Sequence, residues 1–147
     1  MARTVKKDPR HRAREAALQI LYQWEVGRGD VDHAAETFFS QQWPDTDPPA
    51  ASLRAFASAL AHDTVERLCA IDPLIAETAA RWRPERMAVL DRLILRMAIC
   101  ELQRDPGTPR AVVINEALEL ARTFSTEEAV KFINGMLDAI RKKLEAR

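Results

Sequence analysis

The chain has 147 residues, of which 47% are apolar and 30% are charged. That length suits one domain or two very small ones. Only four residues are Gly, which argues against a Gly-rich phosphate loop, a collagen-like repeat and a turn-rich β-sandwich. Lys plus Arg and Asp plus Glu each number 22, so the formal net charge is zero.

The charges are nevertheless segregated along the chain. Residues 1–14 contain six basic residues and one acidic residue, whereas residues 25–72 contain nine acidic and three basic residues. This distribution predicts two surfaces that serve different partners. The basic end is suited to a phosphate backbone.

Nothing in the sequence predicts a membrane segment. No apolar run approaches the ~18–20 residues that span a bilayer, and the basic N-terminal end is not followed by the apolar stretch of a secretory signal. Cys69 and Cys100 are isolated in apolar helical surroundings, so we expect two buried thiols. We therefore expect a cytoplasmic protein that does not bind membranes.

Apolar residues recur at helical spacing throughout the chain, and no segment shows a sustained strand pattern, so we expect an all-α fold. The first helix has a core-facing stripe at Ala13, Ala17, Leu21 and Trp24 and ends in the segment 27–30. The last begins with a hydroxyl cap at Ser125-Thr126. The expected helices cover residues 10–26, 31–42, 52–70, 72–82, 87–103 and 112–124, and one more reaches about 144.

The breaks between these helices rest on proline and capping signals. Three prolines make residues 43–49 the clearest loop. Ser52 is expected to cap the third helix, and Asp72-Pro73 to open the fourth. Arg83-Pro84 is the best internal boundary, which divides the chain into regions 1–82 and 83–147. Residues 87–103 are apolar enough to form the central buried helix of the second region.

The sequence offers little catalytic chemistry. His11, His33 and His62 have no second ligand at metal spacing, so we expect surface or helix-end histidines and no metal ion. There is no nucleotide fingerprint and no activated nucleophile. The acidic pairs Glu116/Glu119 and Glu127/Glu128 are expected to be solvated helix faces. We therefore expect no enzyme, no catalytic residue and no cofactor.

Binding chemistry is better represented at the start of the first helix. Arg10, His11, Arg12 and Arg14 lie on its first turns, and Tyr22 follows Arg14 by two turns, ~12 Å along the axis. A guanidinium and an aromatic ring at that separation can span two or three nucleotides of a single strand. The alternative is a solubilising basic tail with a half-buried tyrosine.

Four segments resemble the family of the bacterial transcription antitermination factor NusB. They are RHRAREAALQILYQW at 10–24, LRMAICEL at 95–102, VINEALELA at 113–121 and KFINGMLD at 131–138, in family order and spacing. The resemblance implies two small helical bundles packed side by side, with about seven helices. It also implies a non-catalytic protein that pairs with the ribosomal protein NusE. In that family the pair binds single-stranded boxA RNA and joins other Nus factors and RNA polymerase, which suppresses termination during ribosomal RNA synthesis.

The resemblance also implies site residues. By position, the RNA-binding residues are Arg10, His11, Arg12, Arg14, Tyr22, Glu127, Glu128, Lys131 and Phe132. His11 interrupts an arginine run that is often continuous in the family. Phe132 also lies on an apolar stripe with Met136 and Ile140, so it is equally consistent with a core residue. Asp91 and the acidic middle of the chain are candidates for contact with NusE.

Gly135 lies inside a helix, where Gly costs ~1 kcal/mol against Ala. We expect close approach of a neighbouring helix there, so Gly135→Ala should destabilise the fold.

Two further hypotheses stand beside the antitermination factor. One is a free-standing version of the NusB-like domain that precedes some ribosomal RNA cytosine methyltransferases, since 147 residues leave no room for the catalytic domain. The other is a helical scaffold that binds only proteins. Some NusB-like proteins self-associate, and the apolar composition does not decide between a monomer and a homodimer.

Overall fold

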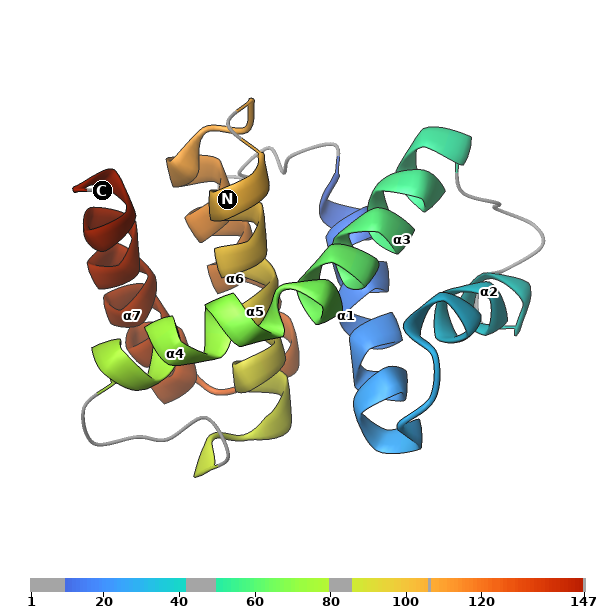
Figure 1. The fold of residues 1–147 in the computed structure, drawn as a ribbon, viewed down its shortest axis with the longest axis horizontal. Coiled ribbons are helices and arrows are strands. Elements are labelled where there is room, and N and C mark those ends of the chain that lie inside the picture. Colours follow the sequence, from blue (N-terminus) through green and yellow to red (C-terminus); the bar gives the residue numbers. More distant parts are fainter. Residues whose placement is uncertain (1–9, 42–49, 80–85, 106, 147) are drawn as a thin grey trace, which may run out of the picture.

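The computed structural model describes residues 10–41, 50–79, 86–105 and 107–146, and every regular element in these ranges is a helix. The all-α class and the expected seven helices are therefore confirmed (Figure 1). In chain order they are α1 (His11–Gly27), α2 (Val31–Gln41), α3 (Ala51–Glu66), α4 (Leu68–Thr78), α5 (Val89–Arg104), α6 (Arg110–Phe124) and α7 (Glu127–Glu145).

The helices form two groups that meet along α5. Helices α1, α2 and α3 pack against one another, and α5, α6 and α7 form the second group (Figure 1). Helix α4 crosses the front of the molecule and packs against α5 and α7. The proposed boundary at Arg83-Pro84 lies outside the described residues, so the division into 1–82 and 83–147 stays a prediction.

Helix α5 is the centre of the core. Every residue from Arg92 to Leu102 is buried, because α5 packs against α1, α3, α4, α6 and α7. A helix surrounded in this way is apolar on all sides. Three of its buried residues are charged (Arg92, Arg96 and Glu101), and buried charges require partners.

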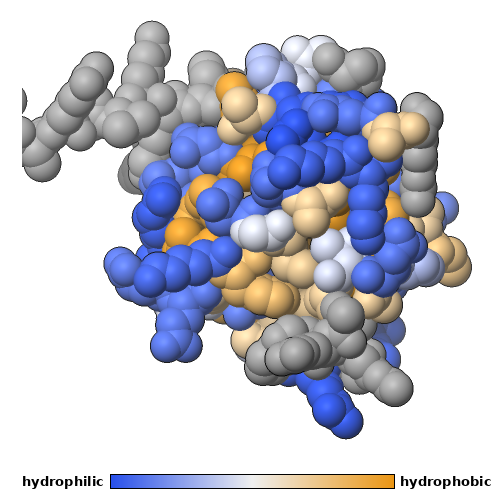
Figure 2. Space-filling view, turned by 90° about the vertical axis from the view of Figure 1, so that its left-hand side faces the viewer, coloured by the Kyte–Doolittle hydropathy of each residue, from blue (hydrophilic) through white to orange (hydrophobic). Residues whose placement is uncertain are grey.

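Helix α7 shows how sequence signals position one element. The Thr126 hydroxyl accepts a hydrogen bond from the Ala129 N–H at 3.1 Å, which confirms the predicted cap. Acidic residues in its first turn and basic residues in its last turn complement the helix dipole. Figure 2 shows the side where α7 lies: hydrophilic side chains cover most of it, and apolar ones show between them. No helix in the described ranges combines the length and apolarity needed to cross a bilayer.

The predicted break between the third and fourth helices was wrong. Helix α3 begins at Ala51 without a side-chain cap from Ser52, and the chain breaks at Arg67 instead of Asp72-Pro73. Pro73 lies inside α4, where its missing N–H removes one hydrogen bond of the helix. The buried residues Ile71, Leu74 and Ile75 flank it, so tertiary packing offsets that loss.

Two predictions about packing were also wrong. No atom outside the local helix lies within 4 Å of a Cβ built on Gly135, and the residue is exposed. Close approach of a neighbouring helix therefore does not explain this glycine. Cys69 is exposed, whereas Cys100 is buried as expected, and burial raises the pKa of the Cys100 thiol.

Candidate nucleic-acid interface

Arg14 is buried at the start of α1, with 2% of its surface exposed. Its Nε and Nη2 donate to the two carboxylate oxygens of Glu101 on α5, at 2.7 and 2.9 Å. Its Nη1 lies 3.5 Å from Oε1 of Glu116 on α6. The bidentate pair with Glu101 therefore joins the first group of helices to the second.

His11 belongs to the same buried network. Its Nδ1 lies 2.9 Å from Glu116 Oε1, and its Nε2 lies 2.8 Å from Glu15 Oε1, outside hydrogen-bond geometry. Glu116 is 1% exposed, which contradicts the expectation that Glu116 and Glu119 form a solvated face. Glu116 instead accepts from both His11 and Arg14.

With 2% and 6% of their surface exposed, Arg14 and His11 offer little area to RNA, and their contact with RNA stays a prediction. Residues two apart on a helix point about 200° apart, so Arg14 turns toward the core while Arg12 turns toward solvent. Arg14 shares its face with Leu18 and Leu21, which are also buried. This arrangement of α1 therefore gives no support to the predicted pairing of Arg14 with Tyr22 across two or three nucleotides.

Arg10 and Arg12 are the exposed arginines at this end of α1. The Arg10 guanidinium lies over the Phe56 ring, 4.5 Å from its centroid, and its Nη1 is 3.8 Å from Asp105 Oδ2. A hydrogen bond from the Thr108 hydroxyl, with further ones from backbone N–H groups, lowers the pKa of Asp105. This end of α1 thus presents guanidinium groups to solvent.

Tyr22 lies further along α1 and borders an apolar hollow. The residue is 45% exposed, and the hollow measures about 420 Å³. Leu90 of α5 and Phe124 of α6 line it together with residues of α1. The sequence analysis did not identify Leu90 or Phe124, because neither stands out within an apolar helix.

A second hollow of about 340 Å³ brings together Asp91, Glu128 and Phe132. Asp91 accepts a hydrogen bond from the Ser125 hydroxyl at 2.6 Å. Phe132 is half-buried and packs against the core, so its ring both lines the hollow and supports the fold. Glu127 and Lys131 are exposed on the same first turns of α7.

The two hollows are neighbours, because consecutive residues line them. Leu90 lines the first and Asp91 the second. We call the combined region, defined by Tyr22, Leu90, Phe124, Asp91 and Phe132, the Tyr22–Phe132 surface. The structure thus brings together residues that the sequence analysis had assigned separately to RNA and to NusE.

The remaining histidines lie away from this surface. His62 Nδ1 is 3.0 Å from Asp32 Oδ1, and this hydrogen bond is the main cause that raises the pKa of His62. His33 is exposed. Within the described ranges, no three His, Cys, Asp or Glu side chains are grouped to hold a metal ion.

Taken together, the fold and this surface define a small all-helical protein with an exposed face of aromatic and charged side chains. The model of the NusB family matches residues 11–142, and the chain belongs to this family. The transcription antitermination protein NusB of Koribacter versatilis is 45% identical over 143 residues, which cover 97% of this chain and 95% of that relative. The NusB of Sorangium cellulosum is 40% identical over 135 residues, which cover 92% of this chain and 93% of that relative.

Solved structures agree with this assignment. T. maritima NusB superposes with a TM-score of 0.83 at 34% identity and covers 94% of both chains. A crystal structure of the antitermination factors NusB and NusE with double-stranded RNA gives a TM-score of 0.79 at 24% identity and covers 92% of this chain. That second likeness establishes the fold alone.

Proposed function

We propose that this protein is a transcription antitermination factor that binds RNA and catalyses no reaction. In this proposal its ligand is the single-stranded boxA element of nascent ribosomal RNA, which it binds together with ribosomal protein NusE. The assembled complex joins other Nus factors on RNA polymerase in the cytoplasm.

The Tyr22–Phe132 surface is the observation that carries the proposal. It offers two aromatic rings beside hollows of about 420 and 340 Å³, and single-stranded RNA is recognised largely by stacking of unpaired bases on such rings. The Glu127 and Glu128 carboxylates can accept from base amino groups, and the exposed Lys131 can pair with a phosphate.

The burial of each basic residue at the start of α1 decides whether we propose it as an RNA contact. In this proposal the exposed Arg10 and Arg12 contact phosphates, whereas the buried Arg14 and His11 hold α1 in place from within the core. We therefore propose RNA contacts at Arg10, Arg12, Tyr22, Glu127, Glu128, Lys131 and Phe132.

A titration of boxA-like RNA tests the function directly. The purified protein is titrated with and without NusE, at several salt concentrations, against a scrambled RNA of the same length. We expect selective binding that strengthens with NusE. Equal, salt-sensitive binding to both RNAs would refute the proposal, since it requires only a basic surface.

Two lysines of α7 provide a matched pair of variants. Lys131 lies at the proposed surface, whereas Lys142 is exposed in the last turn of the same helix. Lys131→Ala should lower the slope of log Kd against log salt by ~0.7, the value for one phosphate contact on a single strand. Lys142→Ala should leave the slope unchanged.

Asp91 stays our candidate for contact with NusE. Asp91→Asn removes the charge but keeps an acceptor for the Ser125 hydroxyl, so the local fold is preserved. We expect weaker NusE binding with unchanged thermal stability. Unaltered affinity for NusE at low salt would remove Asp91 from the interface.

A further inference from the structure

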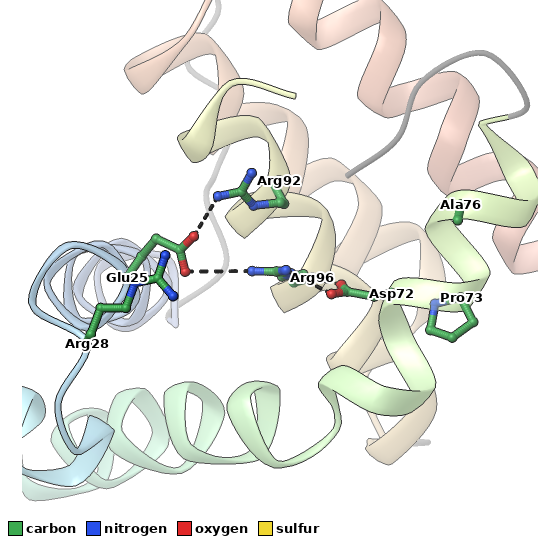
Figure 3. Close-up of a pocket in the computed structure, with 7 residues that line it drawn as sticks. All are labelled: Glu25, Arg28, Asp72, Pro73, Ala76, Arg92 and Arg96. Carbon is green, nitrogen blue, oxygen red and sulfur yellow. Dashed lines mark hydrogen bonds and ion pairs between the residues drawn. The ribbon is translucent and has the colours of Figure 1, made fainter. Parts of the chain in front are cut away.

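A cleft of about 610 Å³ lies where the end of α1 meets α4 and α5 (Figure 3). Five charged residues line it: Glu25, Arg28, Asp72, Arg92 and Arg96. Leu90, Asp91 and Arg92 are consecutive on α5 and line the two hollows and this cleft, respectively. The three depressions therefore surround the first turns of one helix.

Two guanidinium groups of the cleft are held in place by carboxylates. Arg92 and Arg96 lie one turn apart on α5 and are each 9% exposed. Arg96 donates from Nε and Nη2 to the two oxygens of Asp72, at 2.9 and 2.8 Å. Arg92 Nη2 donates to Glu25 Oε1 at 2.6 Å. Figure 3 shows Arg92 and Arg96 reaching toward Glu25 from the same helix.

Arg28 adds a third guanidinium at the end of α1. It is exposed, it lines the cleft, and it forms no ion pair with any other residue in the described part of the chain. Its φ is 57°, and it is the only non-Gly described residue with a positive φ. Gly27 and Gly29 flank it, and Gly adopts this conformation at lower cost.

The cleft therefore carries more positive than negative charge. Three guanidinium groups, each with five N–H donors, face two carboxylates. Arg96 Nη1 is only loosely engaged, since it lies 3.9 Å from Glu25 Oε2. A tetrahedral oxyanion offers acceptors in several directions and matches the planar fork of arginine.

We propose that this cleft binds a phosphate group, with Arg28 as its most adaptable ligand and Arg92 and Arg96 as its fixed ones. The phosphate comes either from the backbone of a bound RNA strand or from free phosphate. The RNA source rests on the proposed function. The free-phosphate source does not.

Inorganic phosphate tests the cleft on the protein alone. The melting temperature is measured in phosphate and in sodium chloride at the same pH and ionic strength, for the wild type, Arg28→Gln and Arg122→Gln. Arg122 is an exposed arginine on α6 outside the cleft and serves as the control. We expect phosphate to raise the melting temperature of the wild type and of Arg122→Gln above its value in chloride. For Arg28→Gln we expect a smaller rise, which corresponds to a phosphate Kd about tenfold weaker.

Equal melting temperatures in phosphate and chloride, or an undiminished phosphate effect in Arg28→Gln, would overturn the proposal. Arg28 forms no ion pair with the residues that the structure describes, so its replacement should not unfold the protein in chloride. The variant therefore reports on the ligand site.

BoxA-like RNA then identifies the source of the phosphate group. If the RNA backbone occupies the cleft, bound RNA abolishes the phosphate effect, and Arg28→Gln lowers the salt slope of RNA binding by ~0.7. If the cleft takes free phosphate, the effect persists beside bound RNA and the slope is unchanged. If the protein binds no RNA, the proposed function is refuted. The phosphate site is not, because it is measured on the protein alone.

Discussion

Arg14 should stabilise the fold much more than it contributes to RNA affinity. Arg14→Ala leaves Glu101 buried, at 2% exposure, without the guanidinium that pairs with it, and leaves the buried Glu116 with His11. Removing one partner of a buried ion pair typically costs about 3–5 kcal/mol. Since small domains are stable by about 5–15 kcal/mol, the variant should lose a large share of its free energy of unfolding. Arg12→Ala, on the exposed face, should change that free energy by about 0.5 kcal/mol or less.

Urea unfolding and salt-dependent RNA titration separate the two roles. Arg14→Lys is the more informative variant, because it keeps the charge but cannot reproduce the fork-like pair with Glu101. We expect a lower urea midpoint for Arg14→Lys with an unchanged salt slope of RNA binding. For Arg12→Ala we expect an unchanged midpoint and a slope lower by ~0.7. A normal midpoint for Arg14→Ala with a reduced slope would show that Arg14 contacts RNA.

Three further predictions concern stability and reactivity. Gly135→Ala should raise the free energy of unfolding by about 0.5–1 kcal/mol, because nothing obstructs a Cβ there; a lower urea midpoint would contradict this. The pair of His62 with Asp32 raises the pKa of folded His62, so it stabilises the fold fully below pH 6.5 and ceases to do so as pH rises through that raised pKa. His62→Gln should therefore lower the melting temperature at pH 5.5 and not at pH 8.5, and equal losses at both would argue against the pair. Brief alkylation of the folded protein, followed by mass spectrometry, should modify Cys69 and spare the buried Cys100.

The helices could be predicted because their signals are local. The period of apolar residues and the Thr126 cap each act within a few residues, and both agree with the structure. The break near Arg67 could not be predicted in the same way. Pro73 is a strong local signal, but the burial of Ile71 and Ile75 against distant helices outweighs it.

The burial of His11 and Arg14 could be predicted from the sequence, whereas their partners could not. His11, Arg14, Leu18 and Leu21 recur at spacings of three and four residues, which places both basic residues on the buried stripe. Glu101 is an acid among apolar residues of its helix, which also indicates a buried cation. What the sequence could not provide was the pairing of Arg14 with a residue 87 positions away.

The buried charges of α5 specify how α1 lies against it. The two helices run antiparallel (Figure 1), so Arg14 meets Glu101 near one end of the contact and Glu25 meets Arg92 near the other. In a parallel arrangement, arginine would face arginine and glutamate would face glutamate, and unpaired like charges in a core are costly. Because both ends are fixed, the register of α1 is fixed as well, and it brings Tyr22 beside Leu90. The zero net charge of the chain thus conceals one buried and one partly buried ion pair that position the exposed aromatic surface.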